Sequence, residues 1–272
     1  MSNFHDIIEH ARELESQQQS YALATVTRVI HPTSANVGDK ALVTADGKLY
    51  GWIGGGCAQP AVTRTAKLCI VDGQPRHIRI TPDPRGEKMV EDVLEFGMPC
   101  QSGGTIELFI DPVMAKPEIV VLGESPVAAA LTRIAPHVGF RVTWLNDGGL
   151  QASGLRILPT ARSTEISPGA YVVVATQGIK DLPQLKLALS LQARHVAFVA
   201  SQRKAQALKT SLLEAGADAA AVAVIESPAG ISINAQTAQE IALSILASLV
   251  SRIRSNDLKQ DGSEAVTANI GA

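Results

Sequence analysis

The run Ile119-Val120-Val121-Leu122-Gly123-Glu124-Ser125-Pro126-Val127-Ala128 opens the second half of the chain and decides its fold. The apolar residues at its start predict a buried strand, and residues 127–137 continue as a helical stretch. A second strand-like run follows at 141–145. Strand, helix and strand in this order predict a βαβ unit, whose two strands lie parallel in one sheet.

Apolar runs and helical stretches keep alternating beyond this unit. Further strands are expected at 171–175, 195–200 and 221–225, and helices near 182–191, 203–215 and 237–252. The pattern predicts a Rossmann-like α/β domain over residues 117–254, with a doubly wound parallel sheet. The polar residues 255–272 predict a flexible tail.

The start of this domain partly matches a dinucleotide-binding fingerprint. Gly123 ends the first strand, and Asp147 ends the second about 20 residues later, where a ribose-binding acid is required. Between them, Ser125 stands in place of the second glycine, and Pro126 removes an N–H donor where the pyrophosphate would lie. Asp147 could also simply begin the turn Asp147-Gly148-Gly149. The sequence therefore supports a Rossmann-like scaffold better than it supports bound NAD.

The first half of the chain has the pattern of a small α+β domain, which we place at residues 1–114. Helices are expected at 4–18, 61–71 and 87–96. Strands are expected at 21–30, 41–44, 77–80 and 105–110, with a hairpin at Asp46-Gly47. Residues 111–117, which contain two prolines, predict a linker between the domains.

The run Gly54-Gly55-Gly56-Cys57 lies where a strand is expected to turn into a helix. Glycines let backbone N–H groups approach an anion, and the helix N-terminus adds a partial positive charge. The same field favours the thiolate of Cys57, which would then be a nucleophile or a soft-metal ligand. The alternative is a tight turn with a buried cysteine.

A second glycine-rich run, Cys100-Gln101-Ser102-Gly103-Gly104, also carries a cysteine. It predicts either a second loop that faces a ligand or a loop that only packs. Cys69 lies inside an apolar helical stretch and is expected in the core. In the second domain, Ser201, Arg203 and Lys204 could hold an anion at a helix start, although a solvated helix face is the simpler expectation.

Composition excludes several classes of function. Lys and Arg total 24 against 26 acidic residues, without a basic run, so nucleic acid is not an expected partner. The N-terminus has no secretory pattern, and no window approaches the roughly 20 apolar residues of a membrane span. We therefore expect a cytoplasmic protein without membrane insertion. Low charge and an apolar final helix are compatible with a homodimer.

The metal-binding residue types are scattered along the chain. The three cysteines form no Cys-x-x-Cys pair, and the six histidines have no i, i+4 spacing. A disulfide framework, a structural zinc site and a metal held only by protein groups are therefore not expected.

Several runs occur in order along nearly the whole chain: Gly51-Trp52-Ile53-Gly54-Gly55-Gly56-Cys57-Ala58-Gln59-Pro60, Cys100-Gln101-Ser102-Gly103-Gly104-Thr105, Gly123-Glu124-Ser125-Pro126-Val127-Ala128, Ala175-Thr176-Gln177-Gly178, and Pro228-Ala229-Gly230-Ile231 with Glu240-Ile241-Ala242-Leu243-Ser244-Ile245-Leu246. Together they resemble the XdhC/CoxI family. Members of that family bind and protect the molybdenum cofactor and help to deliver it, in sulfurated form, to molybdo-hydroxylases such as xanthine dehydrogenase or carbon monoxide dehydrogenase.

The resemblance implies a maturation factor that is not itself an enzyme, with Cys57 nearest the molybdenum as the reactive residue and metal ligand. It also implies a cofactor cradle formed by Gly54, Gly55, Gly56 and Cys57, faced by a loop with Cys100, Gly103 and Gly104. The neighbouring Gln59 and Ser102, and Gly123, Ser125 and Asp147 of the partial dinucleotide fingerprint, complete the residues that we expect to bind a cofactor. The implied partners are a client molybdo-hydroxylase and, as a candidate sulfur source, a cysteine desulfurase.

Two positions depart from the xanthine dehydrogenase branch, which tends to have Glu where Gln59 stands and Gly-x-Gly-His at residues 123–126. The pattern looks closer to the carbon monoxide dehydrogenase branch, whose clients use molybdopterin in its cytosine dinucleotide form. Two alternatives stay open: an NAD(P)-dependent oxidoreductase with a degenerate dinucleotide loop, and a sulfur transferase that depends on Cys57.

Overall fold

The computed structural model describes residues 4–82, 86–90, 93–97, 103–148, 155–166, 169–178 and 180–267; for residues 161, 164 and 256–267 only the backbone is described. The chain divides into two compact units, one built on the residues up to Ala115 and one running from Lys116 to Asn256.

The N-terminal unit is built on a seven-stranded sheet of order β3-β2-β1-β7-β4-β6-β5. Its strands are β1 (Tyr21–Ile30), β2 (Lys40–Thr44), β3 (Leu49–Gly51), β4 (Arg76–Thr81), β5 (Glu87–Val90), β6 (Val93–Gly97) and β7 (Thr105–Val113). Its helices are α1 (Phe4–Ser16) and α2 (Gln59–Asp72). Only β4 and β6 pair in parallel; all other neighbours are antiparallel.

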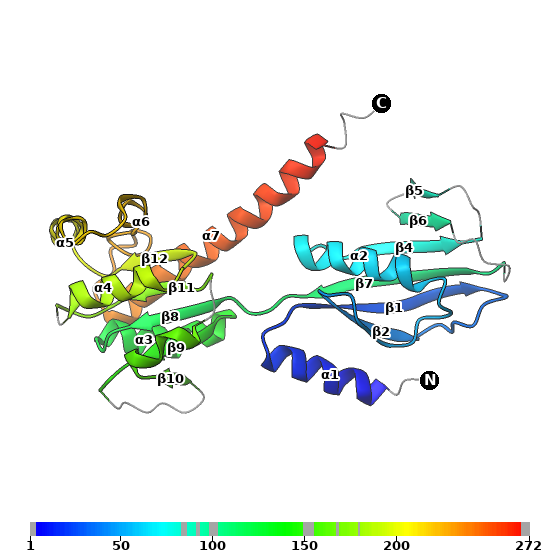
Figure 1. Ribbon diagram of the computed structural model, residues 1–272, viewed down its shortest axis with the longest axis horizontal. Coiled ribbons are helices and arrows are strands. Elements are labelled where there is room, and N and C mark those ends of the chain that lie inside the picture. The colour runs from blue at the N-terminus through cyan, green and yellow to red at the C-terminus, as the bar shows by residue number, and fades with distance from the viewer. Residues whose placement is uncertain are drawn as a thin grey trace. The chain divides into compact units, whose positions relative to one another are not determined.

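The two helices cover opposite faces of this sheet (Figure 1). Val62, Ala66 and Cys69 of α2 are buried in the main core. The apolar residues Ile7 and Leu14 of α1 pack in a smaller cluster on the other face. Both helices thus bury one apolar stripe, which is how an amphipathic helix gains stability from a sheet.

Most expected elements of this unit are confirmed. The strand expected at 21–30 has those bounds, and the helix expected at 61–71 lies within α2. Gly73 ends α2 in the left-handed conformation, with φ of 72°, and its N–H donates to the Cys69 carbonyl. Glycine is the residue that accepts this conformation at a helix end without strain.

The helix expected at 87–96 is wrong, because this segment forms the antiparallel strands β5 and β6. Leu94 and Phe96 pack on the core, whereas Glu95 between them pairs with Lys88 at 3.0 Å and with Arg79 at 3.6 Å. Apolar and charged side chains therefore alternate with the period of a strand. Cross-strand charge pairs of this kind stabilise a hairpin.

The linker expected at 111–117 is shorter than predicted, because β7 continues to Val113, which pairs with Tyr21 of β1. Pro112 is tolerated inside β7 because β4 pairs with β7 only as far as Ile110. A proline lacks an N–H, so it fits a strand where one neighbour is missing.

The C-terminal unit holds a five-stranded parallel sheet of order β10-β9-β8-β11-β12. Its strands are β8 (Glu118–Leu122), β9 (Arg141–Leu145), β10 (Arg156–Leu158), β11 (Tyr171–Val174) and β12 (His195–Phe198). Its helices are α3 (Pro126–Ile134), η1 (Ala135–Val138), η2 (Thr160–Glu165), α4 (Asp181–Ser190), α5 (Gln202–Glu214), α6 (Ala219–Ala223) and α7 (Ala238–Thr267). Read along the chain, this is the Rossmann strand order, with its switch point between β8 and β11.

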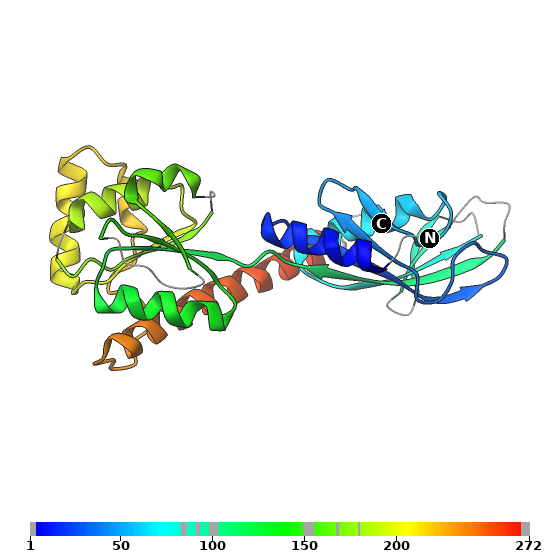
Figure 2. The same cartoon turned by 90° about the horizontal axis from the view of Figure 1, so that it is seen from below.

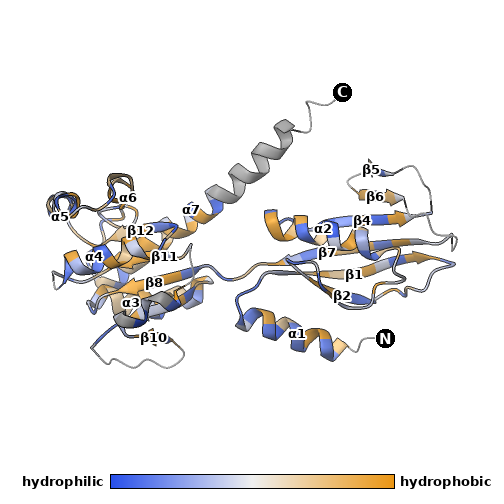
Figure 3. Ribbon diagram, in the orientation of Figure 1, coloured by the Kyte–Doolittle hydropathy of each residue, from blue (hydrophilic) through white to orange (hydrophobic). Residues whose placement is uncertain are grey.

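Helices cover both faces of this sheet (Figure 2), so the predicted doubly wound α/β class is confirmed. Side chains of α3 and α7 pack in the core on one face, and those of α4, α5 and α6 on the other. The central strand β8 is buried throughout and carries the hydrophobic colour in Figure 3. A strand enclosed on both faces is apolar without alternation.

Two segments of the C-terminal unit differ from expectation. The strand expected at 221–225 is wrong: Ala219–Ala223 forms the short helix α6, capped by the Asp218 side chain, which accepts from Ala221 N–H. Alanine is the best helix former, and an aspartate cap favours the same state. The last helix, expected near 237–252, continues to Thr267 and so includes residues placed in the tail. No helix within the described ranges is long and apolar enough to span a membrane.

Candidate functional site

The glycine run lies in the turn between β3 and α2, as the sequence predicts. The Trp52 N–H donates to the Lys40 carbonyl at 2.9 Å, and the Ala58 N–H donates to the Gly55 carbonyl at 3.0 Å. Ala58 precedes the helix and provides no side-chain cap. Cys57 is exposed in this turn, so it is not the buried cysteine of the alternative interpretation.

The three glycines of this turn differ in whether the fold requires a glycine at that position. Gly54 has φ of +115°, and a Cβ there would lie 3.2 Å from Ile106 and 3.3 Å from Ala35, so the fold itself requires glycine. Gly55 and Gly56 do not have positive φ, and a Cβ on Gly56 would meet no atom within 4 Å. The fold gives no steric reason for glycine at 56. A bare backbone at that point leaves room for a ligand to approach.

Gly104, the last residue of the second glycine-rich run, packs against residues 31–35, which also contact the first run. A Cβ on Gly104 would clash with the Pro32 carbonyl, and a Cβ on Gly55 would lie 3.6 Å from the Ser34 hydroxyl. The Trp52 indole N–H also donates to the Ser34 carbonyl at 3.4 Å. Gly104 and the glycine turn therefore both pack against the connection between β1 and β2. Cys100 and Ser102 are outside the described residues, while Gly103 adopts a left-handed turn with φ of +71°.

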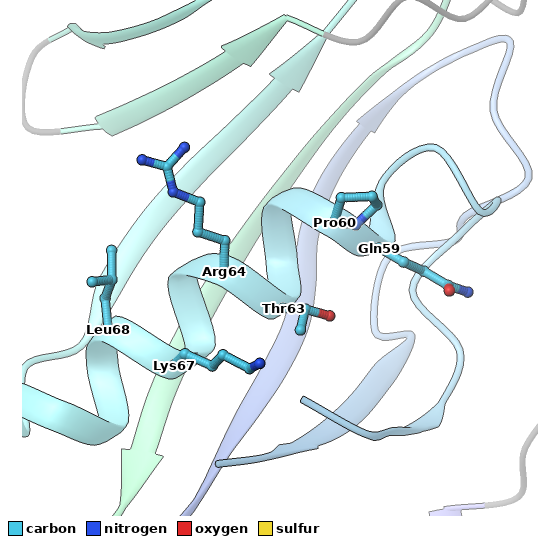
Figure 4. A pocket seen from close by; sticks show the side chains of 6 residues that line it. All are labelled: Gln59, Pro60, Thr63, Arg64, Lys67 and Leu68. Carbon is cyan, nitrogen blue, oxygen red and sulfur yellow. The ribbon is translucent and has the colours of Figure 1, made fainter. Parts of the chain in front are cut away.

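A hollow of about 570 Å³ lies along the outer face of α2 and begins at its first turn (Figure 4). The side chains that line it are Gln59, Pro60, Thr63, Arg64, Lys67 and Leu68. It thus contains Gln59, one of the predicted residues, two positions after Cys57. Thr63, Arg64 and Lys67 were missed by the sequence analysis, although their i, i+3/i+4 spacing on a predicted helix places them on one face.

The two cations of the hollow are held differently. Arg64 pairs with Glu87 of β5 at 2.7 Å, and its side chain is 65% exposed. The stem of Lys67 lies against the β2–β3 hairpin, since a Cβ on Gly47 would be 2.6 Å from its Cε. Together with the Thr63 hydroxyl and the Gln59 amide, these two cations are the polar groups of a lining that is otherwise mostly apolar.

Cys69 is in the core, as predicted. Its side chain is buried, and its thiol lies 3.9 Å from the Ile110 carbonyl. Burial raises the pKa of the Cys69 thiol, which keeps it protonated and unreactive. Within the described ranges, no group of three or more His, Cys, Asp or Glu side chains is placed to hold a metal ion.

The remaining predicted residues belong to the C-terminal unit, at the carboxyl ends of β8 and β9. Gly123 has φ of +105°, and a Cβ there would lie 2.5 Å from the Ala175 carbonyl oxygen. Trp144 donates its indole N–H to the Gly123 carbonyl at 2.7 Å. Ser125 caps α3, because its hydroxyl accepts from the Ala128 N–H at 3.1 Å. The first glycine is thus required for the close approach of β8 and β11.

The Asp147 side chain is hydrogen-bonded to Thr160. Its two carboxylate oxygens accept from the backbone N–H and the hydroxyl of Thr160, both at 2.8 Å. These hydrogen bonds lower the pKa of the Asp147 carboxyl, with a smaller contribution from the charge of Lys180. Asp147 therefore does more than begin a turn, since it ties the end of β9 to the first residue of η2.

The helix start at Ser201 is structural. The Ser201 hydroxyl accepts from the Lys204 N–H at 3.4 Å, and Lys204 is ion-paired with the buried Asp181. Burial raises the pKa of the Asp181 carboxyl, but hydrogen bonds from Lys204 and Thr176 outweigh it, so the pKa lies below its ordinary value. Of the two cations named for this helix start, Arg203 and Lys204, the second is thus used within the unit.

Two family models match successive parts of the chain. Residues 14–81 match the XdhC and CoxI family, and residues 119–249 match the XdhC Rossmann domain. The two matches follow the order of the two units and together cover well over half of the chain.

Individual proteins resemble this chain in sequence or in structure at low sequence identity. The chain is 26% identical over 258 residues to the uncharacterized protein YqeB of Escherichia coli (strain K12). That match covers 90% of this chain and 46% of YqeB, so the chain spans about half the length of this relative. A crystal structure of a xanthine dehydrogenase from Bacillus halodurans is 20% identical, with a TM-score of 0.46, over 91% of this chain and 96% of the other.

Proposed function

Because the chain belongs to the XdhC and CoxI family, we propose that it is an accessory protein of molybdenum hydroxylases. It binds the molybdenum cofactor at the turn before α2 and helps to deliver it, in sulfurated form, to a client enzyme. The observation that carries this proposal is the exposed Cys57 at the end of an open glycine turn, next to a hollow whose lining includes Lys67 and Arg64. A cysteine desulfurase is the class of enzyme that would supply the sulfur.

The residues of the turn fit the molybdenum end of such a cofactor. When bound, the cofactor would supply a molybdenum centre with an exchangeable sulfur. A thiolate is a soft ligand, so Cys57 suits contact with this centre. Gly55 and Gly56 have no Cβ, so a ligand can approach the backbone at these two positions.

The hollow fits the phosphate end. The Lys67 ammonium and the Arg64 guanidinium supply positive charge, and the Thr63 hydroxyl and Gln59 amide supply hydrogen bonds. A ligand that reaches from Cys57 along α2 would meet Gln59 first and Lys67 last, in the order of the helix turns. Gly103 and Gly104 contribute the neighbouring loop, with the predicted Cys100 and Ser102 on the same run.

A sulfur-transferase role for Cys57 is a second candidate, which the exposure of this thiol favours. A sulfur transferase requires a persulfide on Cys57, whereas the accessory role requires a bound cofactor. Mass spectrometry of Cys57 after incubation with a cysteine desulfurase and cysteine distinguishes the two.

The test is anaerobic addition of molybdenum cofactor to the purified protein, followed by desalting and measurement of the retained pterin and molybdenum. We expect stoichiometric retention by the wild type and at least a tenfold loss of affinity for Cys57→Ala, which corresponds to about 1.4 kcal/mol. Lys67→Ala is expected to weaken retention about threefold, because exposed charge pairs contribute little each.

Two control variants match these substitutions. Val71→Ala removes an exposed apolar side chain of α2 that lies outside the hollow, and Lys186→Ala removes an exposed cation of α4. Both are expected to retain cofactor as the wild type does. If Cys57→Ala retains the cofactor fully while remaining folded, the turn is not the binding site and the proposal fails.

A further inference from the structure

The carboxyl-end crevice between β8 and β11 is the place where a Rossmann fold binds a dinucleotide. Three features make such a site: free N–H groups at the start of the helix, a glycine that lets the pyrophosphate approach, and an acid that binds the ribose. Each can be compared with the residues that this chain has there.

The start of α3 has few donors left for a phosphate. Of the N–H groups that a helix leaves unsatisfied at its start, that of Ser125 points to the Ala175 carbonyl at 3.4 Å. Position 126 is proline and has no N–H, and the Ala128 N–H donates to the Ser125 hydroxyl at 3.1 Å. The capping hydroxyl thus occupies the position that a phosphate oxygen takes in a dinucleotide complex.

A carboxylate lies beside this helix start. A Cβ built on Gly148 would be 2.5 Å from Oε2 of Glu124 and 2.9 Å from Oε1. The Glu124 side chain therefore reaches from the loop after β8 to the backbone after β9, across the path from the helix start to the ribose acid. Its negative charge opposes a pyrophosphate at that point.

The acid at the end of β9 is also engaged. Both carboxylate oxygens of Asp147 accept hydrogen bonds from Thr160, whereas a ribose-binding acid keeps its oxygens for the sugar hydroxyls. Of the features that a dinucleotide needs, only the close approach at Gly123 is kept, and this serves the packing of β8 on β11.

We propose that the segment Glu124-Ser125-Pro126 excludes dinucleotides from this crevice, NAD(P) and the dinucleotide form of the molybdenum cofactor alike. The Rossmann fold of the C-terminal unit then works without a bound nucleotide. This exclusion is independent of the cofactor site at Cys57, because it rests on residues of the other unit.

The two tryptophans of the chain allow a direct test. Trp144 is buried below the Gly123 loop, and Trp52 belongs to the N-terminal unit. In a Trp52→Phe background, Trp144 is the sole tryptophan, and NADH bound in the crevice would quench its emission by energy transfer. We expect no saturable quenching up to about 1 mM NADH, a limit that corresponds to a binding free energy near −4 kcal/mol.

The complementary variant restores the fingerprint. In the same background, Glu124→Ala removes the carboxylate, Ser125→Gly removes the capping hydroxyl, and Pro126→Ala restores the backbone N–H. We expect this variant to bind NADH at least tenfold more tightly than its parent. If the triple variant does not fold, the single variants Ser125→Gly and Glu124→Ala are compared with the parent for NADH binding instead. Ser125→Gly is expected to fold, because glycine in place of serine at a helix cap costs only a few tenths of a kcal/mol.

The outcomes separate clearly. Saturable quenching of Trp144 in the parent protein at micromolar NADH would overturn the exclusion. If neither the parent nor any folded variant binds NADH, the assignment of exclusion to residues 124–126 is overturned. Binding of cofactor at Cys57 can succeed or fail in separate experiments without changing either result.

Discussion

The two units of this protein each contain a strand that turns into a helix through a glycine, and the two turns differ in what satisfies the helix start. Before α2, the capping position is Ala58, which has no side-chain hydrogen bond, and Cys57 is exposed beside it. Before α3, Ser125 caps the helix, and the loop is fastened to Ala175 and Trp144. Both helices have a proline in the first turn and a capping N–H that donates to a carbonyl, so the difference between the two turns lies in the side-chain cap and in the exposed thiol.

The largest contrast is expected in thiol reactivity. Cys57 is exposed, whereas Cys69 is fully buried and its pKa is raised, so a reagent reaches Cys69 only when the unit opens. We expect Cys57 to be alkylated by iodoacetamide orders of magnitude faster than Cys69. Peptide mass spectrometry over a time course measures both rates; equal rates would show that the first turn is not the open one.

Replacement by alanine is expected to reduce stability strongly at a glycine of the second turn and little at a glycine of the first. Gly123→Ala places a Cβ against the Ala175 carbonyl at a positive φ and is expected to lower the free energy of unfolding by about 2–4 kcal/mol. Gly56→Ala meets open space and is expected to change it by less than about 1 kcal/mol, while weakening cofactor retention. Urea unfolding of both variants, followed by circular dichroism, measures the difference. A large loss of stability in Gly56→Ala would show that this glycine is structural after all.

The cap of α3 gives a smaller effect. Ser125→Ala leaves the Ala128 N–H without its partner and is expected to cost about 1 kcal/mol. Ser125→Gly should cost only a few tenths of a kcal/mol, because the backbone at the cap can then be solvated. Urea unfolding monitored by Trp144 emission compares the two; equal losses would mean that the hydroxyl is not satisfying the helix start.

The smallest effect is a pH dependence in the C-terminal unit. The lowered pKa of Asp181 means that its contribution to stability is present above its ordinary pKa of 3.8 and is lost as the pH falls below that value. Asp181→Asn should therefore destabilise the unit at neutral pH, but less and less as the pH is lowered below 4. Urea midpoints of wild type and variant across this range test it, and parallel curves would exclude the Asp181–Lys204 pair as the cause.

Local patterns in the sequence predicted most of the fold. The bounds of β1 and the end of α2 follow from an apolar period and from Gly73, both of which act within a few residues. The segment 87–96 was misassigned because Val90, Val93 and Leu94 recur at i, i+3 and i+4, which is also the spacing of a helix face. The strand expected at 221–225 failed for a similar reason, since the Asp218 cap and the alanines favoured a helix.

The candidate site was predicted in part. Cys57 and its glycines could be found because they are consecutive, and Gln59 because it follows them. The hollow along α2 could not, because Thr63 and Lys67 are ordinary residues of a helix surface until the hairpin at Gly47 lies beside them. The contact of Glu124 with the backbone at Gly148 was equally hidden, since it joins two loops that only the fold brings together.

Protection of Cys57 by the cofactor tests the contrast between the two turns most directly. The protein is alkylated anaerobically with and without molybdenum cofactor, and the peptide that contains Cys57 is quantified while the retained molybdenum is measured in the same samples. If the open turn holds the cofactor, alkylation of Cys57 falls in proportion to the molybdenum retained. Full retention of molybdenum with an unchanged alkylation rate at Cys57 would contradict it.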